Sequence, residues 1–226
     1  MSCKIPENIR LCLEEDLGKE FIERVIGKTQ TYVCVIGNTE TAKIPGVSAA
    51  GANPDTTDTT PAADMELLHY GRCKCIDGVP VTPTGVPTPG IITMSATKMS
   101  KMPIFVVNAG TRVKPHVPYF ELDGSPGEDI RTGKAVKNAE RTFDRAVLAG
   151  KALAKISNYL VIGESIAGGT TTAYGVLTAL GYDAKGKVSS SMIDNPSSLK
   201  DNIVQEGLRN CGISESILKK DPMMAV

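Results

Sequence analysis

A chain of 226 residues, 41% of them hydrophobic, is long enough to bury one substantial core, as one domain or as a domain with a small lobe. Its 25 Lys and Arg balance its 25 Asp and Glu, so no global field draws it onto nucleic acid or an anionic membrane. It lacks both the roughly 18 to 20 continuous apolar residues of a membrane helix and the apolar run of a secretory signal, so we expect a cytoplasmic protein.

The first elements of the chain are predicted to be a helix and a strand. Apolar residues recur at a spacing of about 3.6 from Ile9 to Ile26, which predicts an amphipathic helix that ends at Gly27. Residues 31–36 form an apolar, β-branched run, typical of a strand covered on both faces. We therefore assign residues 1–29 to the helical segment of a small lobe and residues 30–226 to an α/β domain.

Residues 37–103 are dense in Gly, Pro, Thr and Ala and show no regular period. A loop of this length without structure is unusual in a compact domain. We therefore expect short elements here, including a strand near Met65 to His69 and a helix that begins at Thr88-Pro89. Segments of this kind often line ligands.

The rest of the chain alternates strands with helices. Residues 104–107 and 159–162 repeat the pattern of a strand covered on both faces, and residues 134–156 between them place apolar residues on one helical face. Residues 171–180 predict a helix that ends before Gly181, and another begins at Asn195-Pro196. This order predicts a three-layer α/β fold, with a mostly parallel sheet and helices on both faces.

The stretch from Tyr159 to Thr172 carries the clearest functional pattern. A buried strand runs through Gly168 and Gly169 into a helix that begins with threonines. Free amides, the helix dipole and hydroxyl groups would meet there, so the turn predicts a site for one phosphate. A P-loop is excluded because Gly169 stands where that motif has its lysine, and the glycines do not follow the dinucleotide-binding order.

Two kinds of charged residue are candidates for the same site. Glu164 directly follows the predicted strand, where it either binds a ribose hydroxyl or a cationic ring, or caps backbone amides. The cation that balances the phosphate is Lys185, Lys187 or Lys200, and Lys200 is favoured because it lies one turn inside a helix, after a serine-rich loop. A lone helical lysine is more often solvated.

The remaining polar candidates are weaker. Asn108 follows the strand at 104–107, where it either contacts a ligand or shapes a turn. Six cysteines are scattered along the chain, and Cys73 and Cys75 have one residue between them rather than the usual two to four or so of a zinc site. We therefore expect neither disulfides nor a metal.

Several motifs together resemble the archaeal branch of the nicotinate-nucleotide:dimethylbenzimidazole phosphoribosyltransferases, the CobT-like proteins of cobalamin synthesis. The resemblance covers roughly residues 30 to 212. It includes Val35-Ile-Gly-Asn-Thr-Glu-Thr41, Thr60-Pro-Ala-Ala-Asp64, Pro83-Thr-Gly-Val-Pro-Thr-Pro89 and Gly163-Glu-Ser-Ile-Ala-Gly-Gly-Thr-Thr-Thr172. The last segment is the most specific, because it is similar to the family's Gly-Glu-x-x-x-Gly-x-Thr-Thr turn.

The resemblance implies an activity. Enzymes of this family transfer the ribose phosphate of nicotinate mononucleotide to a benzimidazole-type base, release nicotinate, use no cofactor and are commonly homodimers. By this likeness Glu164 would be the catalytic carboxylate near the ribose. The phosphate would be held by Gly168, Gly169, Thr170, Thr171 and Lys200. Further substrate contacts would come from Thr84, Gly85, Asn108, Ser189 and Ser190.

One departure from the family keeps other functions open. Family members are usually longer at the carboxyl end, so we expect that part of the family domain is missing from this chain. A non-catalytic module that binds a ribotide or phosphate, or that acts in regulation, is therefore the main alternative to a transferase. A subunit that acts only in assembly is a third.

Overall fold

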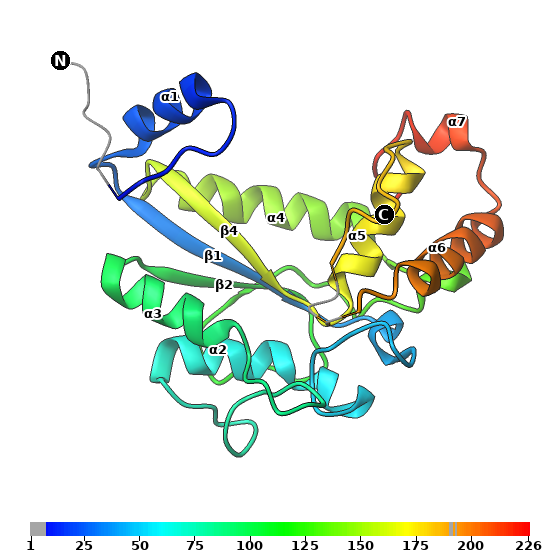
Figure 1. Cartoon of the computed structure of the whole chain (residues 1–226), viewed down its shortest axis with the longest axis horizontal. Coiled ribbons are helices and arrows are strands. Elements are labelled where there is room, and N and C mark those ends of the chain that lie inside the picture. The colour runs from blue at the N-terminus through cyan, green and yellow to red at the C-terminus, as the bar shows by residue number, and fades with distance from the viewer. Residues whose placement is uncertain (1–7, 190–191, 193) are drawn as a thin grey trace.

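The computed structural model describes residues 8–189, 192 and 194–226. A four-stranded parallel sheet lies at its centre, in the order β3-β2-β1-β4 (Figure 1). The strands are β1 Gln30–Gly37, β2 Ile104–Gly110, β3 Phe120–Glu121 and β4 Tyr159–Ser165. Three of the four predicted strands therefore exist, and the short edge strand β3 is an addition.

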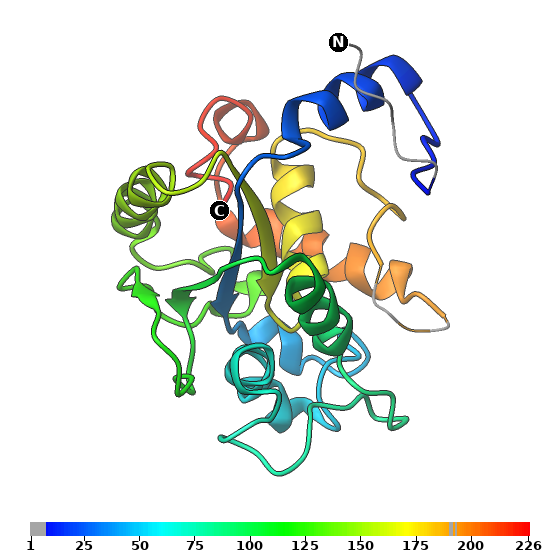
Figure 2. The same ribbon diagram turned by 90° about the vertical axis from the view of Figure 1, so that its left-hand side faces the viewer.

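Helices cover both faces of this sheet, which confirms the predicted α/β fold (Figures 1 and 2). On one face lie α2 Thr60–Tyr70 and α3 Gly90–Ser100, and on the other lies α4 Ala139–Leu153. Beyond β4 follow α5 Gly169–Ala179 and α6 Ser197–Cys211, which pack against each other. The outer helices are α1 Glu15–Val25 and α7 Glu215–Leu218, and short 3-10 helices occupy Glu40–Lys43, Pro54–Asp58 and Ile130–Thr132.

The core follows from the alternation of side chains along β1. Cys34 and Ile36 point toward α2 and pack with Met65. Val33 points to the opposite face and packs with Leu153 of α4. Because successive strand residues face opposite sides, a continuous apolar run buries both faces of a central strand.

The strand predicted near Met65 to His69 is wrong, because these residues belong to α2. Every residue from Thr60 to Leu68 is buried, so the helix shows none of the polar and apolar alternation from which a helical period is read. Its ends carry the ordinary signals: a proline in the first turn, and Gly71 in the left-handed conformation after the last residue.

The helix expected at the start of the chain is also shorter than predicted. α1 begins at Glu15, and Glu14 before it has a left-handed backbone with φ 48°. Residues 1–7 of the segment assigned to the small lobe lie outside the described residues. None of the helices in the described parts of the chain is both long and apolar enough to span a membrane.

The strand β4 is placed correctly by its sequence but is not covered on both faces. It pairs only with β1, so its other edge has no partner strand within the described residues. The face of β4 is also incompletely covered, because Ile162 is 71% exposed. An apolar run indicates a strand, but it does not indicate whether the chain supplies a neighbour for both edges.

Candidate functional site

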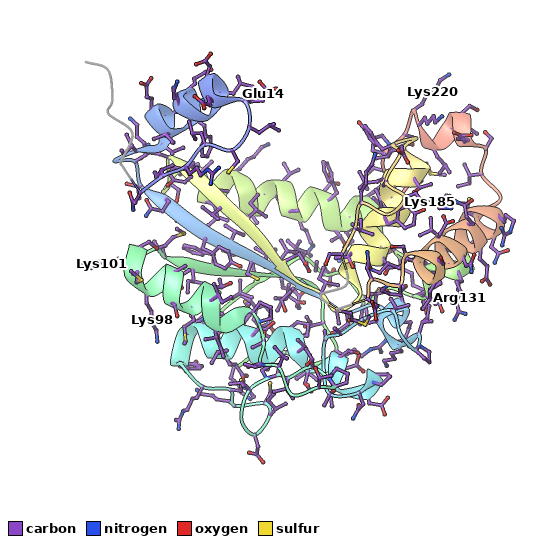
Figure 3. All side chains as sticks on the ribbon, viewed as in Figure 1. Glu14, Lys98, Lys101, Arg131, Lys185 and Lys220 are labelled. Carbon is purple, nitrogen blue, oxygen red and sulfur yellow. The ribbon has the colours of Figure 1, made fainter. Side chains whose placement is uncertain are left out.

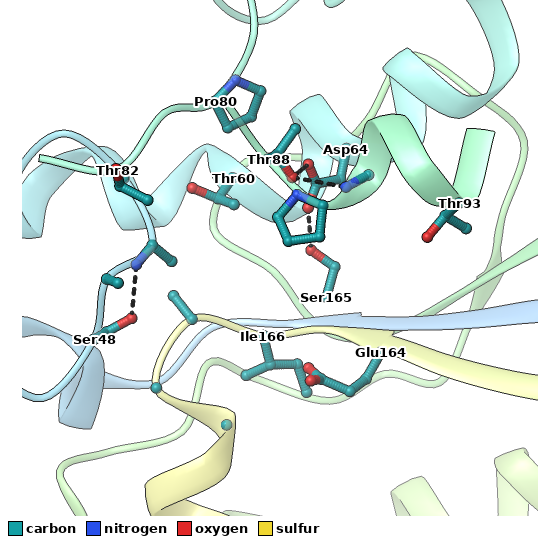
Figure 4. A pocket seen from close by; sticks show the side chains of 18 of the residues that line it. Ser48, Thr60, Asp64, Pro80, Thr82, Thr88, Thr93, Glu164, Ser165 and Ile166 are labelled. Carbon is teal, nitrogen blue, oxygen red and sulfur yellow. Dashed lines mark hydrogen bonds between the residues drawn. The ribbon is translucent and has the colours of Figure 1, made fainter. Parts of the chain in front are cut away.

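A cavity of about 340 Å³ lies beside the middle of β1 and at the carboxyl end of β4, the end of a parallel strand at which α/β sheets bind their ligands (Figure 4). Five parts of the chain line it. These are β1 through Tyr32 and Cys34, residues 47–51, α2 through Asp64, the loop from Pro80 to Gly90, and the turn from Glu164 to Thr170. The segment 37–103, in which the sequence shows no regular helical or strand period, thus contributes much of the cavity wall.

The turn between β4 and α5 has the backbone of an anion site. Gly168 adopts φ 74°, and a Cβ there would lie 3.0 Å from the backbone of Ala42, so conformation and space both require glycine. Within the described chain, no acceptor is hydrogen-bonded to the amides of Ala167, Gly168 and Thr170. These amides lie at the amino end of α5, where the helix dipole favours negative charge.

The buried lysine of α6 lies against the same helix end. Lys200 is only 1% exposed, and its Nζ donates to Oγ1 of Thr170 at 3.0 Å and to the carbonyl oxygen of Ser189 at 2.5 Å. Among the described residues it forms no ion pair, and burial lowers its pKa. Thr171 follows Thr170 in α5, and its buried Oγ1 has no hydrogen-bond partner in the described chain. The ammonium of Lys200, the hydroxyl of Thr170 and the free amides thus lie together at this turn, which favours one anionic group.

Glu164 lies beside this turn, on the α5 side of β4. A Cβ on Gly169 would lie 3.3 Å from its Oε2, so the carboxylate is adjacent to the helix end. Burial raises the pKa of Glu164, the amide of Ile166 lowers it, and the charge of Asp64 raises it further. Figure 4 places Glu164 below the β4 ribbon, whereas Asp64 and Ser165 lie above it.

Asp64 is the site residue that sequence reasoning missed. It is 8% exposed, and its two oxygens accept hydrogen bonds from Oγ1 of Thr88 and Oγ of Ser165, each at 2.8 Å. Burial raises its pKa against the lowering effect of these two hydroxyls. Its sequence signal was an acidic residue inside the apolar Thr60-Pro-Ala-Ala-Asp64 segment, which was quoted for the resemblance but given no role.

The other predicted substrate contacts lie away from the cavity. Asn108 is fully buried, and its Oδ1 accepts hydrogen bonds from the amides of Gly110 and Thr111, so it shapes the turn after β2. Thr84 and Gly85 are at an exposed loop tip, where Thr82 and Val86 line the cavity and they do not. The carbonyl group of Ser189 contacts Lys200, and Ser190 lies outside the described residues.

The two other lysines that the sequence offered as phosphate-binding cations form ion pairs within the protein. Lys185, labelled in Figure 3, pairs with Asp201, and Lys187 pairs with Asp183. The free thiols in the described chain are Cys12, Cys34, Cys73, Cys75 and Cys211. Within the same residues, no three His, Cys, Asp or Glu side chains gather as a metal site requires.

Several archaeal proteins are similar to this chain in sequence. A UPF0284 protein of Methanothermobacter thermautotrophicus is 43% identical over 91% of this chain and 58% of its own length. The chain is similar to UPF0284 proteins. Those of Archaeoglobus fulgidus and Sulfurisphaera tokodaii are 46% and 49% identical, over 85% and 79% of this chain and 55% and 52% of their own lengths.

The chain thus spans about half the length of the curated relatives it matches. No family model matches it. The name UPF0284 protein states neither an activity nor a ligand, so function has to be argued from the site itself.

Proposed function

We propose that this chain binds nicotinate mononucleotide by its phosphate at Gly168 to Thr171 and serves transfer of the ribose phosphate to a benzimidazole-type base. The observation that carries the proposal is the buried Lys200, which lacks an ion-pair partner in the described chain and hydrogen-bonds Thr170 at the amino end of α5. A desolvated ammonium is costly without a counter-ion, and a bound phosphate supplies one. The free amides of the turn add donors to the same group.

The place of Glu164 supports the second half of the proposal. A carboxylate next to the phosphate site repels additional anionic groups, but it stabilises positive charge on a nearby ribose. In the transfer, a ring nitrogen of the base supplies the electron pair for a new bond to the anomeric carbon. Nicotinate leaves with the electron pair of the old bond, and the N–H proton of the base is released. Positioning the two substrates in one cavity supplies much of the rate.

The first experiment is calorimetric titration with nicotinate mononucleotide and, as the phosphate-free control, nicotinate riboside. We expect the mononucleotide to bind more tightly in the wild-type chain. Lys200→Met should reduce this preference about tenfold or more, because it removes a charge-assisted hydrogen bond. Lys187→Met, which changes an exposed lysine that pairs with Asp183, is the matched control and should keep the preference. Equal binding of the two ligands by the wild type would overturn the phosphate site.

A second measurement separates a transferase from a non-catalytic ribotide-binding module. Release of nicotinate is followed after benzimidazole is added to the loaded chain, and Glu164→Gln should slow release more than it weakens binding. Binding without release would favour the module, which is the alternative that the partial span of the relatives keeps open.

A further inference from the structure

The carboxylate of Asp64 accepts fewer hydrogen bonds from the described residues than it is able to accept. Each oxygen of Asp64 accepts one hydroxyl, from Thr88 or from Ser165, whereas a carboxylate offers about four acceptor positions. The hydroxyl of Thr88 is itself held by the amide of Gly90, so the group is fixed in place from both sides. Asp64 is therefore a preorganised acceptor that lines the cavity.

The cavity that this acceptor lines combines hydroxyl side chains, such as Thr60 and Thr93, with a stiff apolar part. The cavity wall next to it carries aliphatic and proline side chains from α2 and from the loop at 80–90. These include Leu68, Pro80, Val81, Val86 and Pro87. Walls of this kind suit a flat, largely apolar ring, and one polar group among them sets the ring's orientation.

We propose that Asp64 selects and orients the incoming base: its carboxylate accepts the N–H of an azole ring, which turns the second ring nitrogen toward the ribose. This inference rests on the proposed function, because the ribose is carried by the phosphate turn at 168–171. Asp64 is then a specificity-determining residue for the acceptor, distinct in role from Glu164 beside the turn.

The position of Glu164 makes it the poorer candidate for this task. It lies on the α5 side of β4, beside Gly169, and its side chain is more exposed than that of Asp64. A shielded acceptor discriminates more strongly, because a ligand that cannot donate leaves it desolvated and unpaired. The geometry thus divides the two carboxylates between the ribose and the base.

The test compares benzimidazole with 1-methylbenzimidazole, which has the same ring and no N–H. Both are titrated calorimetrically into the chain, alone and with saturating ribose 5-phosphate as an unreactive occupant of the phosphate site. We expect the wild type to prefer benzimidazole roughly tenfold or more. Asp64→Asn should abolish the preference, because the amide keeps a partner for each hydroxyl but presents a donor to the ring. Asp183→Asn, at an exposed surface position, should retain it.

Two results would overturn the assignment: no preference in the wild type, including failure of both bases to bind, or a preference that survives in Asp64→Asn. Nicotinate mononucleotide is titrated into the same proteins, and we expect it to bind Asp64→Asn as it binds the wild type. If the mononucleotide fails to bind the wild type, the phosphate site is wrong. If it binds and the bases show no preference, only the role of Asp64 is lost.

Discussion

Two carboxylates on opposite sides of α2 receive different hydrogen-bond donors. Asp64 and Glu66 are two residues apart, about 200° around the helix, so they face opposite directions. Asp64 faces the cavity and accepts hydrogen bonds from two hydroxyls. Glu66 is fully buried and accepts hydrogen bonds from the amides of Lys74, Cys75 and His116 and from the His116 ring.

The pKa values of the two groups move in opposite directions for a physical reason. Burial raises the pKa of both. At Glu66, the hydrogen bonds from His116 and from the two amides of the 74–75 loop outweigh burial and lower the pKa to about 2. At Asp64, two hydroxyls do not outweigh it. Burial of a carboxylate therefore does not separate a structural role from a functional one, whereas the identity and number of its donors does.

The largest effect is expected from replacing each carboxylate by its isosteric amide. Glu66→Gln sets an amide NH₂ group against backbone donors that have no other acceptor among the described residues. We therefore expect a loss of about 2 to 4 kcal/mol in the free energy of unfolding. Asp64→Asn keeps both hydroxyl partners and removes a buried charge, so its stability should equal or exceed that of the wild type near neutral pH. Urea unfolding of both variants measures the contrast, and equal loss in both would refute it.

The pH dependence of stability should separate the same two residues. The folded pKa of Glu66 is about 2, below its ordinary 4.5, so its contribution is complete above pH 4.5 and is lost as the pH falls toward 2. The advantage of the wild type over Glu66→Gln should therefore shrink over that range, by roughly 3 kcal/mol at most. Urea unfolding of the wild type and of Glu66→Gln at a series of pH values measures this difference in the free energy of unfolding.

For Asp64 we expect the opposite pH dependence of the free energy of unfolding. Its folded pKa is raised above 3.8, so the wild type loses stability as the pH rises through that folded pKa. Asp64→Asn does not titrate, and its stability relative to the wild type should increase with pH. A difference that is constant from acid to neutral pH would show that burial of Asp64 carries no such penalty.

The site also shows which of its parts could be predicted from the sequence and which could not. The phosphate turn was predicted because its glycines, threonines and strand are contiguous in the chain. Lys200 lies 30 residues from Thr170. Its place one turn inside a predicted helix made it the favoured cation of three, and the resemblance then assigned it to the phosphate. The pairing of Asp64 with Ser165 joins residues 101 apart, and α2 itself was misassigned as a strand because its buried residues hide the helical period.

A smaller loss is expected from the exposed partner of Glu66. The His116 side chain is 62% exposed and its Nδ1 lies 2.7 Å from Oε1 of Glu66. His116→Ala removes this contact but leaves the three backbone amides in place, so we expect a loss of roughly 1 kcal/mol in the free energy of unfolding. A loss as large as that of Glu66→Gln would mean that the ring, and not the backbone, holds the carboxylate.

The smallest expected effect is the coupling between Asp64 and Ser165. Ser165→Ala removes one hydroxyl donor from Asp64, so a double-mutant cycle with Asp64→Asn should give a coupling of about 0.5 to 1 kcal/mol in unfolding free energy. The same cycle with Glu66→Gln should give a coupling near zero, because the two carboxylates lie on opposite sides of α2 and share no partner. Equal coupling in both cycles would mean that the sides of α2 act as one network, and the cavity carboxylate could then not be changed without disturbing the structural one.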